Sequence, residues 1–317
     1  MSPSVTHPDD AIPESLTGRW WVFVRQRFDP VSHLAMIVAL FLAHYGAFIA
    51  GWVGESHSVP LPLLLLAGLS TLAFFFKLRL YDELKDHEED AQVYPDRPLV
   101  CGVLQPKHLK IGIAVCFAVE LAGMGVLGAG ALAGMGMTIA YSMLMYREFF
   151  LSGFLRPRLT AYAVVHTVVT VLLTHTLFAA FTGQAPWKLD GRAWRFALGS
   201  WCLFNLFEFG RKTFAAEEER DEVNSYSKVW TRWGAVALAW IMAGAATWLM
   251  LGEHLAHSRL LLGWAAAIGT LLLAAGLAYG LLNRPPFGQV YRGATSGFLV
   301  LLYLGIAVAC AYARQSR

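Results

Sequence analysis

The chain has 317 residues, of which 56% are hydrophobic and 15% are charged, and its formal net charge is +3. Ordinary soluble domains contain about 25% charged residues. A composition this apolar, with a mean hydropathy of +0.49, excludes a disordered chain, a nucleic-acid-binding domain and a disulfide-stapled secreted module. It indicates a protein that crosses a membrane several times.

The N-terminal residues 1–28 precede the first long apolar run and carry Trp20, Trp21, Phe23 and Phe28 beside several arginines. This mixture is typical of an amphipathic helix that lies at a membrane interface. We therefore predict a cytoplasmic N-terminal arm over residues 1–28 and a single transmembrane domain over residues 29–317.

Nine apolar runs follow, and each is close to the ~20 residues that a membrane helix needs. They cover roughly residues 31–54, 60–81, 108–127, 129–146, 160–182, 193–213, 229–251, 258–282 and 293–313. The third and fourth are joined only by Gly128-Ala129-Gly130, which predicts a tight hairpin. The expected fold is an all-α integral membrane bundle of nine transmembrane helices.

The distribution of Lys and Arg orients this bundle, because cytoplasmic loops carry an excess of positive charge. A cytoplasmic N-terminus places 19 of the 25 Lys and Arg residues in inside segments. This predicts an N-in, C-out protein of the cell membrane. The loops after the second and sixth helices, and any active site that they form, then face the cytoplasm.

A first carboxylate cluster ends the second predicted helix, where Asp82, Asp86 and Asp90 have i, i+4, i+8 spacing. On a helix these side chains form one stripe, and their mutual repulsion destabilises the helix. A divalent cation would offset the repulsion, and Mg²⁺ is commonly held by one or two carboxylates together with substrate phosphates. Charged groups at a membrane boundary also tend to be functional.

A second charged cluster ends the sixth predicted helix. Glu208 precedes Lys212 by four residues, which favours an ion pair, and Asn205 lies one turn before Glu208. Carboxylates at Glu217, Glu218, Asp221 and Glu222 repeat the spacing of the first cluster, while Arg211, Lys212 and Arg220 are suited to phosphate oxygens.

These motifs resemble those of the UbiA superfamily of intramembrane prenyltransferases. The aspartate stripe is followed by Arg97-Pro98-Leu99-Val100-Cys101-Gly102, similar to the Pro-Leu-x-x-Gly segment of that family, although Asp82 stands where the family has Asn. Ser225-Tyr226-Ser227 fits the segment after the second family motif, and Glu218 takes the place of an Asp. Tyr141 to Arg147 is similar to the family's Tyr-Pro-x-x-Lys-Arg, shifted by one.

The resemblance implies a magnesium-dependent enzyme acting on an isoprenyl diphosphate, with roles for residues from both clusters. The implied Mg²⁺ ligands are Asp82, Asp86, Asp90, Glu217, Glu218 and Asp221, with Asp82, Asp86, Asp90 and Glu218 as catalytic residues. The implied diphosphate ligands are Arg97, Arg147, Arg211, Lys212 and Arg220. The candidates for the cavity that holds the prenyl chain are Tyr81, Tyr146, Asn205, Phe207 and Glu208.

Three functions remain open at this stage. The first is transfer of the prenyl group to an aromatic or other small acceptor in the membrane. The second is a terpene cyclase, or synthase, that quenches the same carbocation within the isoprenoid chain. The third is a transporter or non-catalytic membrane scaffold. Transporters place their charges near the bilayer midplane, whereas the charges here gather at one interface.

Overall fold

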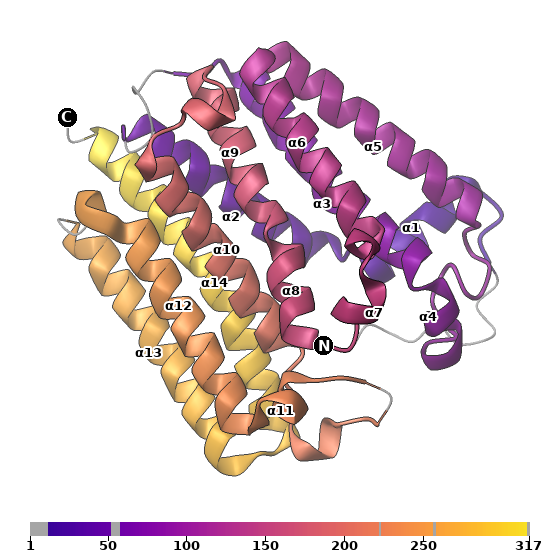
Figure 1. Ribbon diagram of the computed structural model, residues 1–317. Coiled ribbons are helices and arrows are strands. Elements are labelled where there is room, and N and C mark those ends of the chain that lie inside the picture. Colours follow the sequence, from indigo (N-terminus) through magenta and orange to yellow (C-terminus); the bar gives the residue numbers. More distant parts are fainter. Residues whose placement is uncertain (1–11, 52–57, 222, 256–257, 316–317) are drawn as a thin grey trace.

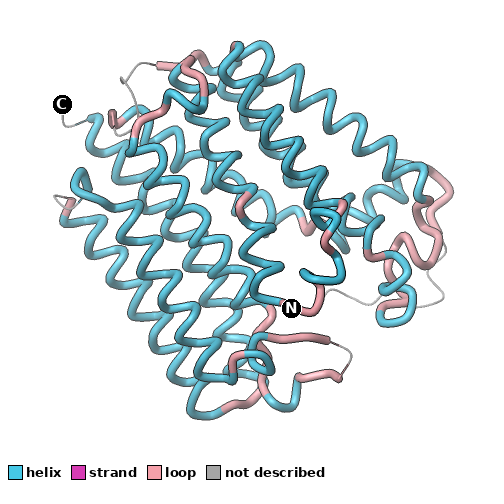
Figure 2. The backbone as a smooth tube through the Cα atoms, in the orientation of Figure 1, coloured by secondary structure: helices cyan, strands magenta, loops and turns pink. Residues whose placement is uncertain are grey.

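The computed structural model describes residues 12–51, 58–221, 223–255 and 258–315, and within these ranges the chain contains helices and loops but no strand (Figure 2). The longest helices run along the height of the bundle (Figure 1). They are α2 (Pro30–Ile49), α3 (Leu61–Lys85), α5 (Pro106–Leu127), α6 (Ala129–Tyr146), α8 (Leu159–Thr167) with α9 (Val169–Thr182), α10 (Gly191–Arg211), α12 (Thr231–Leu255), α13 (Arg259–Leu282) and α14 (Pro285–Gln315). The shorter helices are α1 (Leu16–Arg27), α4 (His87–Val93), α7 (Ser152–Leu155) and α11 (Tyr226–Val229).

The predicted all-α membrane class is confirmed, and each of the nine apolar runs falls on a helix or helix pair. Residues 52–54 of the first run lie outside the described residues. Eight spans are long and apolar enough to cross a membrane. The ninth, α10, is more polar because it contains Asn205 and Glu208, but it lies between α9, α12 and α14 in the bundle (Figure 1). The crossing of α10 and the N-in, C-out orientation remain predictions.

The fifth apolar run forms one candidate span, Leu159–Thr182, as expected over residues 160–182. Its hydrogen-bond pattern is interrupted at Val168, between α8 and α9, where the backbone keeps a helical φ of −55° and ψ of −26°. The hydroxyl of Thr167 donates to the carbonyls of Ala163 and Val164, and such back-bonding by Thr competes with the backbone hydrogen bonds and bends helices. Helix α8 lies at the end of the bundle where α7 and α11 also lie (Figure 1).

The expected hairpin between α5 and α6 is present and turns at a single residue, Gly128, whose φ of 122° suits glycine. Helix α5 also packs closely on α3. A Cβ added at Gly123 would lie 2.1 Å from the hydroxyl of Ser70, so only glycine permits this approach. About two turns further along α3 toward the aspartate stripe, Lys77 forms a fully buried ion pair with Glu120 of α5.

The predicted interfacial segment is helical as α1, which begins after the N-cap Ser15. Phe23 is fully buried and packs in a cluster with Leu80 of α3, with Leu99 and Leu104 of the loop that precedes α5, and with Leu109 of α5. Helix α1 therefore braces the end of α3 that carries the aspartate stripe. The division into an arm over residues 1–28 and a domain over residues 29–317 remains a prediction.

Candidate active site

A cavity of about 800 Å³ opens at the end of the bundle where α4, α7 and α11 lie (Figure 1). Its walls come from α3, α4, α6, α8 and α10, so it joins the two charged clusters of the sequence. Six carboxylates line it: Asp82, Asp86, Glu89, Asp90, Glu148 and Glu208. Seven cations line it: Arg27, Arg79, Lys85, Arg97, Arg156, Arg211 and Lys212.

The aspartate stripe keeps its helical spacing although α3 ends at Lys85. The backbone N–H of Asp86 donates to the backbone carbonyl of Asp82 at 2.9 Å, and that of Asp90 donates to the backbone carbonyl of Asp86 at 2.8 Å. The helical hydrogen-bond pattern therefore continues into α4. The three carboxylates consequently enter the cavity from one side. This is the arrangement expected from their i, i+4, i+8 spacing.

Asp82 and Asp86 have no cation within hydrogen-bond distance. The ammonium of Lys85 lies 3.6 Å from Asp82 and 3.9 Å from Asp86, and Arg79 lies 3.9 Å from Asp82. Burial raises the pKa of Asp86 above its ordinary value, and the charge of Lys85 opposes that rise. The protein's own cations thus offset part of the repulsion in the stripe, and two carboxylates retain free oxygens.

Asp90 and Glu89 are instead occupied by arginines. Asp90 is bonded to Arg97, whose guanidinium also stacks on the ring of Tyr94 at 4.3 Å. Burial lowers the pKa of Arg97 to about 10. Glu89 is bonded to Arg156. These pairs fix α4 against its surroundings and leave Asp90 and Arg97 fewer free atoms for a ligand than Asp82 and Asp86 have.

The turn after α6 holds Arg156 in place from the other side. Residues Glu148, Phe149 and Phe150 all have positive φ angles of 49–57°, an uncommon backbone for non-glycine residues. Glu148 is buried and accepts two hydrogen bonds from Arg156, at 2.9 and 3.0 Å. These hydrogen bonds raise the pKa of Arg156. The strained turn thereby places a fixed cation at the rim of the cavity.

The end of α10 supplies the opposite wall. Glu208 accepts hydrogen bonds from Arg211, and Lys212 lies 3.1 Å from it. This confirms the ion pair expected between Glu208 and Lys212. Asn205, by contrast, is buried and donates to the carbonyl of Trp201, and Phe207 packs in the hydrophobic core, so neither lines the cavity.

The later carboxylates of the second cluster line a separate, adjacent cavity of about 450 Å³, together with Arg220. Glu218 is held there by two hydrogen bonds from Arg292, at 2.8 and 2.6 Å, which lower its pKa. Glu217 and Asp221 are exposed, and Asp221 lines neither cavity. Glu222 lies outside the described residues. The structure therefore brings Glu208, Arg211 and Lys212 to the aspartate stripe, but not Glu217, Glu218, Asp221 or Arg220.

The Ser225-Tyr226-Ser227 segment has a structural part in this loop. The hydroxyls of Ser225 and Ser227 donate to Glu219 at 2.8 and 2.6 Å, while Tyr226 is fully buried and its ring packs on Phe209 of α10. Glu219 was not among the residues singled out from the sequence. The segment folds the loop back onto the end of α10.

Two aromatic residues separate the main cavity from another hollow. Tyr81 and Tyr146, with ring centres 4.9 Å apart, line both the main cavity and a neighbouring one of about 470 Å³. Arg147 lines only that neighbouring cavity. Two of the expected aromatic residues are thus at the site, and Arg147 lies behind them.

Lys85, Tyr162 and His166 also line the cavity, although no motif in the sequence predicted them there. Lys85 donates to the hydroxyl of Tyr162 at 2.7 Å, and the rings of Tyr162 and His166 stack with centres 3.8 Å apart. The only signal in the sequence was that polar residues in α8 are costly in a membrane. Tyr162 and His166 line the cavity together with Asp82 and Asp86 of the stripe.

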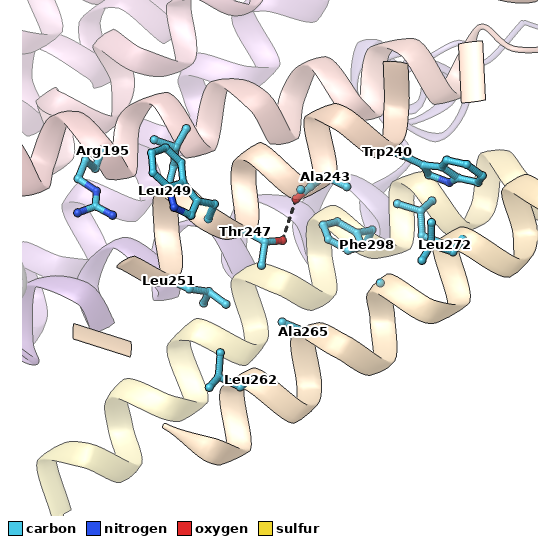
Figure 3. A pocket seen from close by; sticks show the side chains of 14 residues that line it. Arg195, Trp240, Ala243, Thr247, Leu249, Leu251, Leu262, Ala265, Leu272 and Phe298 are labelled. Carbon is cyan, nitrogen blue, oxygen red and sulfur yellow. Dashed lines mark hydrogen bonds between the residues drawn. The ribbon is translucent and has the colours of Figure 1, made fainter. Parts of the chain in front are cut away.

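Another cavity, of about 930 Å³, is of a different kind. It lies between α12, α13 and α14, and Arg195 is its one charged lining residue (Figure 3). A metal and a diphosphate need several charged ligands. The smaller cavity beside Asp82 and Asp86 is therefore the candidate active site.

Comparison with known proteins agrees with this architecture. A model of the UbiA prenyltransferase family matches residues 39–286. The chain belongs to this family. No curated protein sequence gave a significant match.

Two solved structures have the same UbiA fold. One is the apo structure of a UbiA homolog from Aeropyrum pernix K1, with a TM-score of 0.62 and 16% identity over 86% of this chain and 97% of that chain. The other is digeranylgeranylglyceryl phosphate synthase, with a TM-score of 0.61 and 13% identity over 93% of this chain and 99% of that chain. The resemblance proposed from the motifs is confirmed.

Proposed function

We propose that this UbiA-family protein is a Mg²⁺-dependent enzyme that ionises an isoprenyl diphosphate and transfers the prenyl group to an acceptor in the membrane. The observation that supports it most is the single cavity in which the free carboxylates of Asp82 and Asp86 meet Arg211 and Lys212 of α10. Carboxylate oxygens suit Mg²⁺, and the cations suit diphosphate oxygens.

The residues present fit the metal. Among the described residues no group of three or more His, Cys, Asp or Glu side chains is arranged to hold a metal ion by itself, so the proposed site rests on two carboxylates together with substrate phosphates, as is common for Mg²⁺. Asp82 and Asp86 would hold it, with Asp90 fixed beside them by Arg97. When bound, Mg²⁺ would neutralise charge on the diphosphate as it leaves. The other expected ligands, Glu217, Glu218 and Asp221, lie outside this cavity, and Glu218 would first have to leave Arg292.

Side chains of the protein would bind the diphosphate and stabilise the carbocation. Arg211 and Lys212 would bind the leaving diphosphate, and Lys85 lies on the opposite wall, at the end of α3. The aromatic faces of Tyr81, Tyr146 and Tyr162 line the cavity and would stabilise the allylic cation.

Transfer to an acceptor also releases a proton, since the new bond to the prenyl carbon replaces an acceptor O–H or C–H bond. His166 is suited to take it. Its Nδ1 lies 2.7 Å from the carbonyl of Tyr162, which can only accept, so Nδ1 carries the hydrogen and Nε2 keeps a lone pair. Nε2 is buried and has no hydrogen-bond partner, while the residue lines the cavity.

The alternative is a UbiA-type terpene cyclase, in which the cation closes within its own chain and His166 would take the proton from a carbon. The test is to incubate the purified protein with Mg²⁺ and isoprenyl diphosphates of increasing length, with and without phenolic acceptors. Diphosphate release that depends on the acceptor, with a prenylated product by mass spectrometry, supports transfer. A cyclic hydrocarbon or alcohol formed without acceptor supports cyclisation, and absence of diphosphate release from every substrate supports a non-catalytic scaffold.

A further inference from the structure

Helices α12 and α13 touch at one end of the bundle and leave a hollow toward the other. Near the candidate active site the indole of Trp233 lies on Gly280, where an added Cβ would come within 2.4 Å of the ring. Further along, Trp240 lies on Gly276 in the same way. Beyond Trp240 the two helices enclose the groove of about 930 Å³, whose floor includes Phe298 of α14 (Figure 3).

The lining of this groove combines small residues with large apolar ones. Ala243 and Gly244 of α12 and Ala265 and Gly269 of α13 line it, together with leucines, two tryptophans and Phe298. Small residues on two membrane helices normally let the backbones approach closely, yet here they border a space that no described side chain fills. An apolar chain from the bilayer would restore the lost contacts.

The depth of the groove matches one leaflet. Its lining on α13 extends from Leu262 to Leu273, which is about 16 Å of helix. The hydrocarbon core of a bilayer is about 30 Å thick. The groove therefore accommodates the acyl chain of a lipid that enters from one face, and Trp240 closes it near the middle of the membrane.

The open end of the groove carries a positive charge. Figure 3 shows Arg195 and Leu251 at one end and Trp240 and Leu272 at the other. The guanidinium of Arg195 lies 5.7 Å from the ring of Trp248, and no carboxylate of a described side chain is within ion-pair distance of it. An arginine with no carboxylate partner among the described side chains, beside an apolar groove, matches a phosphate attached to a hydrocarbon chain.

The position of Arg195 along α10 indicates the membrane leaflet that faces the open end of the groove. It precedes Glu208 on α10 by 13 residues, about 20 Å along the helix axis, so it lies toward the face opposite the candidate active site. We propose that the groove between α12 and α13 binds one acyl chain of an anionic glycerophospholipid of that leaflet, with the lipid phosphate on Arg195. The proposal is independent of the enzymatic reaction.

The experiment measures thermal unfolding of the full-length protein in detergent with added dioleoylphosphatidylglycerol or dioleoylphosphatidylcholine. The anionic lipid is expected to raise the midpoint by a few degrees more than the zwitterionic one. Gly269→Leu fills the groove, and Gly263→Leu is its matched control. Both glycines lie on α13 with nothing within 4 Å of an added Cβ, but Gly263 does not line the groove.

The arginine is tested separately with Arg195→Gln and Arg195→Lys. Support for the proposal is a preference for the anionic lipid that is kept in Gly263→Leu and Arg195→Lys and lost in Gly269→Leu and Arg195→Gln. Equal stabilisation of the wild type by both lipids, or a full preference in Gly269→Leu, overturns it. An isoprenyl diphosphate whose stabilising effect disappears in Gly269→Leu would assign the groove to the substrate tail and also overturn it. Should Gly269→Leu fail to fold, the two Arg195 variants decide alone.

Discussion

Asp82 and Asp86 differ from the other carboxylates of the cavity because their oxygens are free. Asp90, Glu89, Glu148 and Glu208 each accept hydrogen bonds from an arginine, whereas the nearest cation to Asp82 or Asp86 lies 3.6 Å away or more. A ligand that needs carboxylate oxygens therefore meets no competing protein donor at these two residues. The other four carboxylates, through their arginine partners, hold the surrounding helices and loops in position.

This difference predicts that Asp82→Ala and Asp86→Ala each lower turnover of an isoprenyl diphosphate by at least about 100-fold, because each removes a candidate Mg²⁺ ligand. Glu88→Ala is the matched control, since Glu88 is exposed and lines no part of the cavity. Release of diphosphate at saturating Mg²⁺ is the measurement. Turnover in either aspartate variant close to that of Glu88→Ala would remove these residues from the metal site.

The role given to His166 can be separated from a structural one by comparison with His175. Both rings bond a backbone carbonyl through Nδ1, at 2.7 and 2.8 Å, and both leave Nε2 buried without a partner. Only His166 lines the cavity. We expect His166→Phe to lower formation of the final product by about 10²–10⁴-fold, and His175→Phe to leave it near wild type.

Product analysis with both variants is the check. If His166 takes the proton after ionisation, His166→Phe should still release diphosphate while its organic products change to hydrolysed or rearranged forms. Equal losses in the two histidine variants, or unchanged products in His166→Phe, would contradict the assignment.

At the scale of helices, the contact between α3 and α5 depends on the buried pair of Lys77 and Glu120. Both side chains are fully buried, and Lys77 also lies 4.4 Å from the ring of Phe117. Removing one partner of a buried pair leaves an uncompensated charge and costs about 3–5 kcal/mol, whereas replacing both by apolar groups is often neutral. Lys77→Met should therefore strongly destabilise the protein, and Lys77→Met/Glu120→Leu should recover most of the loss.

Unfolding in mixed detergent measures this cycle, with Glu120→Leu as the remaining single variant. Additive losses in the double variant would show that the two residues act separately. Because Lys77 precedes Tyr81 by about one turn, a shifted α3 would also change the position of the aspartate stripe.

The loop after α10 is tied to α14 by Glu218 and Arg292, and this contact predicts a pH dependence. Hydrogen bonds from Arg292 lower the pKa of Glu218 below its ordinary value of 4.5. A carboxyl with a lowered pKa stabilises the folded state above its unfolded-state pKa, and the stabilisation disappears as the pH falls through the folded-state pKa. We expect Glu218→Gln to lower the unfolding midpoint at pH 7, and the gap to wild type to close below about pH 4.5. A gap that stays constant down to pH 3 would contradict this.

The same loop shows where sequence patterns reach their limit. Periodicity and apolar length predicted the helices, because a membrane span needs about 20 apolar residues wherever it lies. The spacing of Asp82, Asp86 and Asp90 predicted one wall of the cavity, since helical spacing is local. The partner of Glu218 could not be predicted, because Arg292 is 74 residues away and only tertiary packing brings α14 to the loop. Nor could the place of His166 in the wall of the cavity, which depends on how α8 packs beside α3.

At the scale of the whole molecule, the cavity joins two parts of the bundle that the chain keeps far apart. One wall comes from α3 and α4 and the other from the end of α10. Its six carboxylates and seven Lys and Arg side chains give a formal charge of about +1. A trianionic diphosphate changes this to about −2, and one Mg²⁺ returns it to about zero, so each ligand makes the site more favourable for the other.

This balance predicts that Mg²⁺ and diphosphate bind cooperatively, with a coupling free energy of about 1–3 kcal/mol, and that together they draw the two walls into one unit. The measurement is a titration with an unreactive thio-diphosphate analogue, followed by thermal unfolding, with Mg²⁺ or with a chelator. Wild type should be stabilised much more with Mg²⁺. Asp86→Ala should lose the dependence on Mg²⁺, since it removes a metal ligand, while Lys212→Gln should weaken the analogue in both conditions. Equal stabilisation in Mg²⁺ and in chelator would mean that no metal links the walls, and the scaffold alternative would then be favoured over the enzyme.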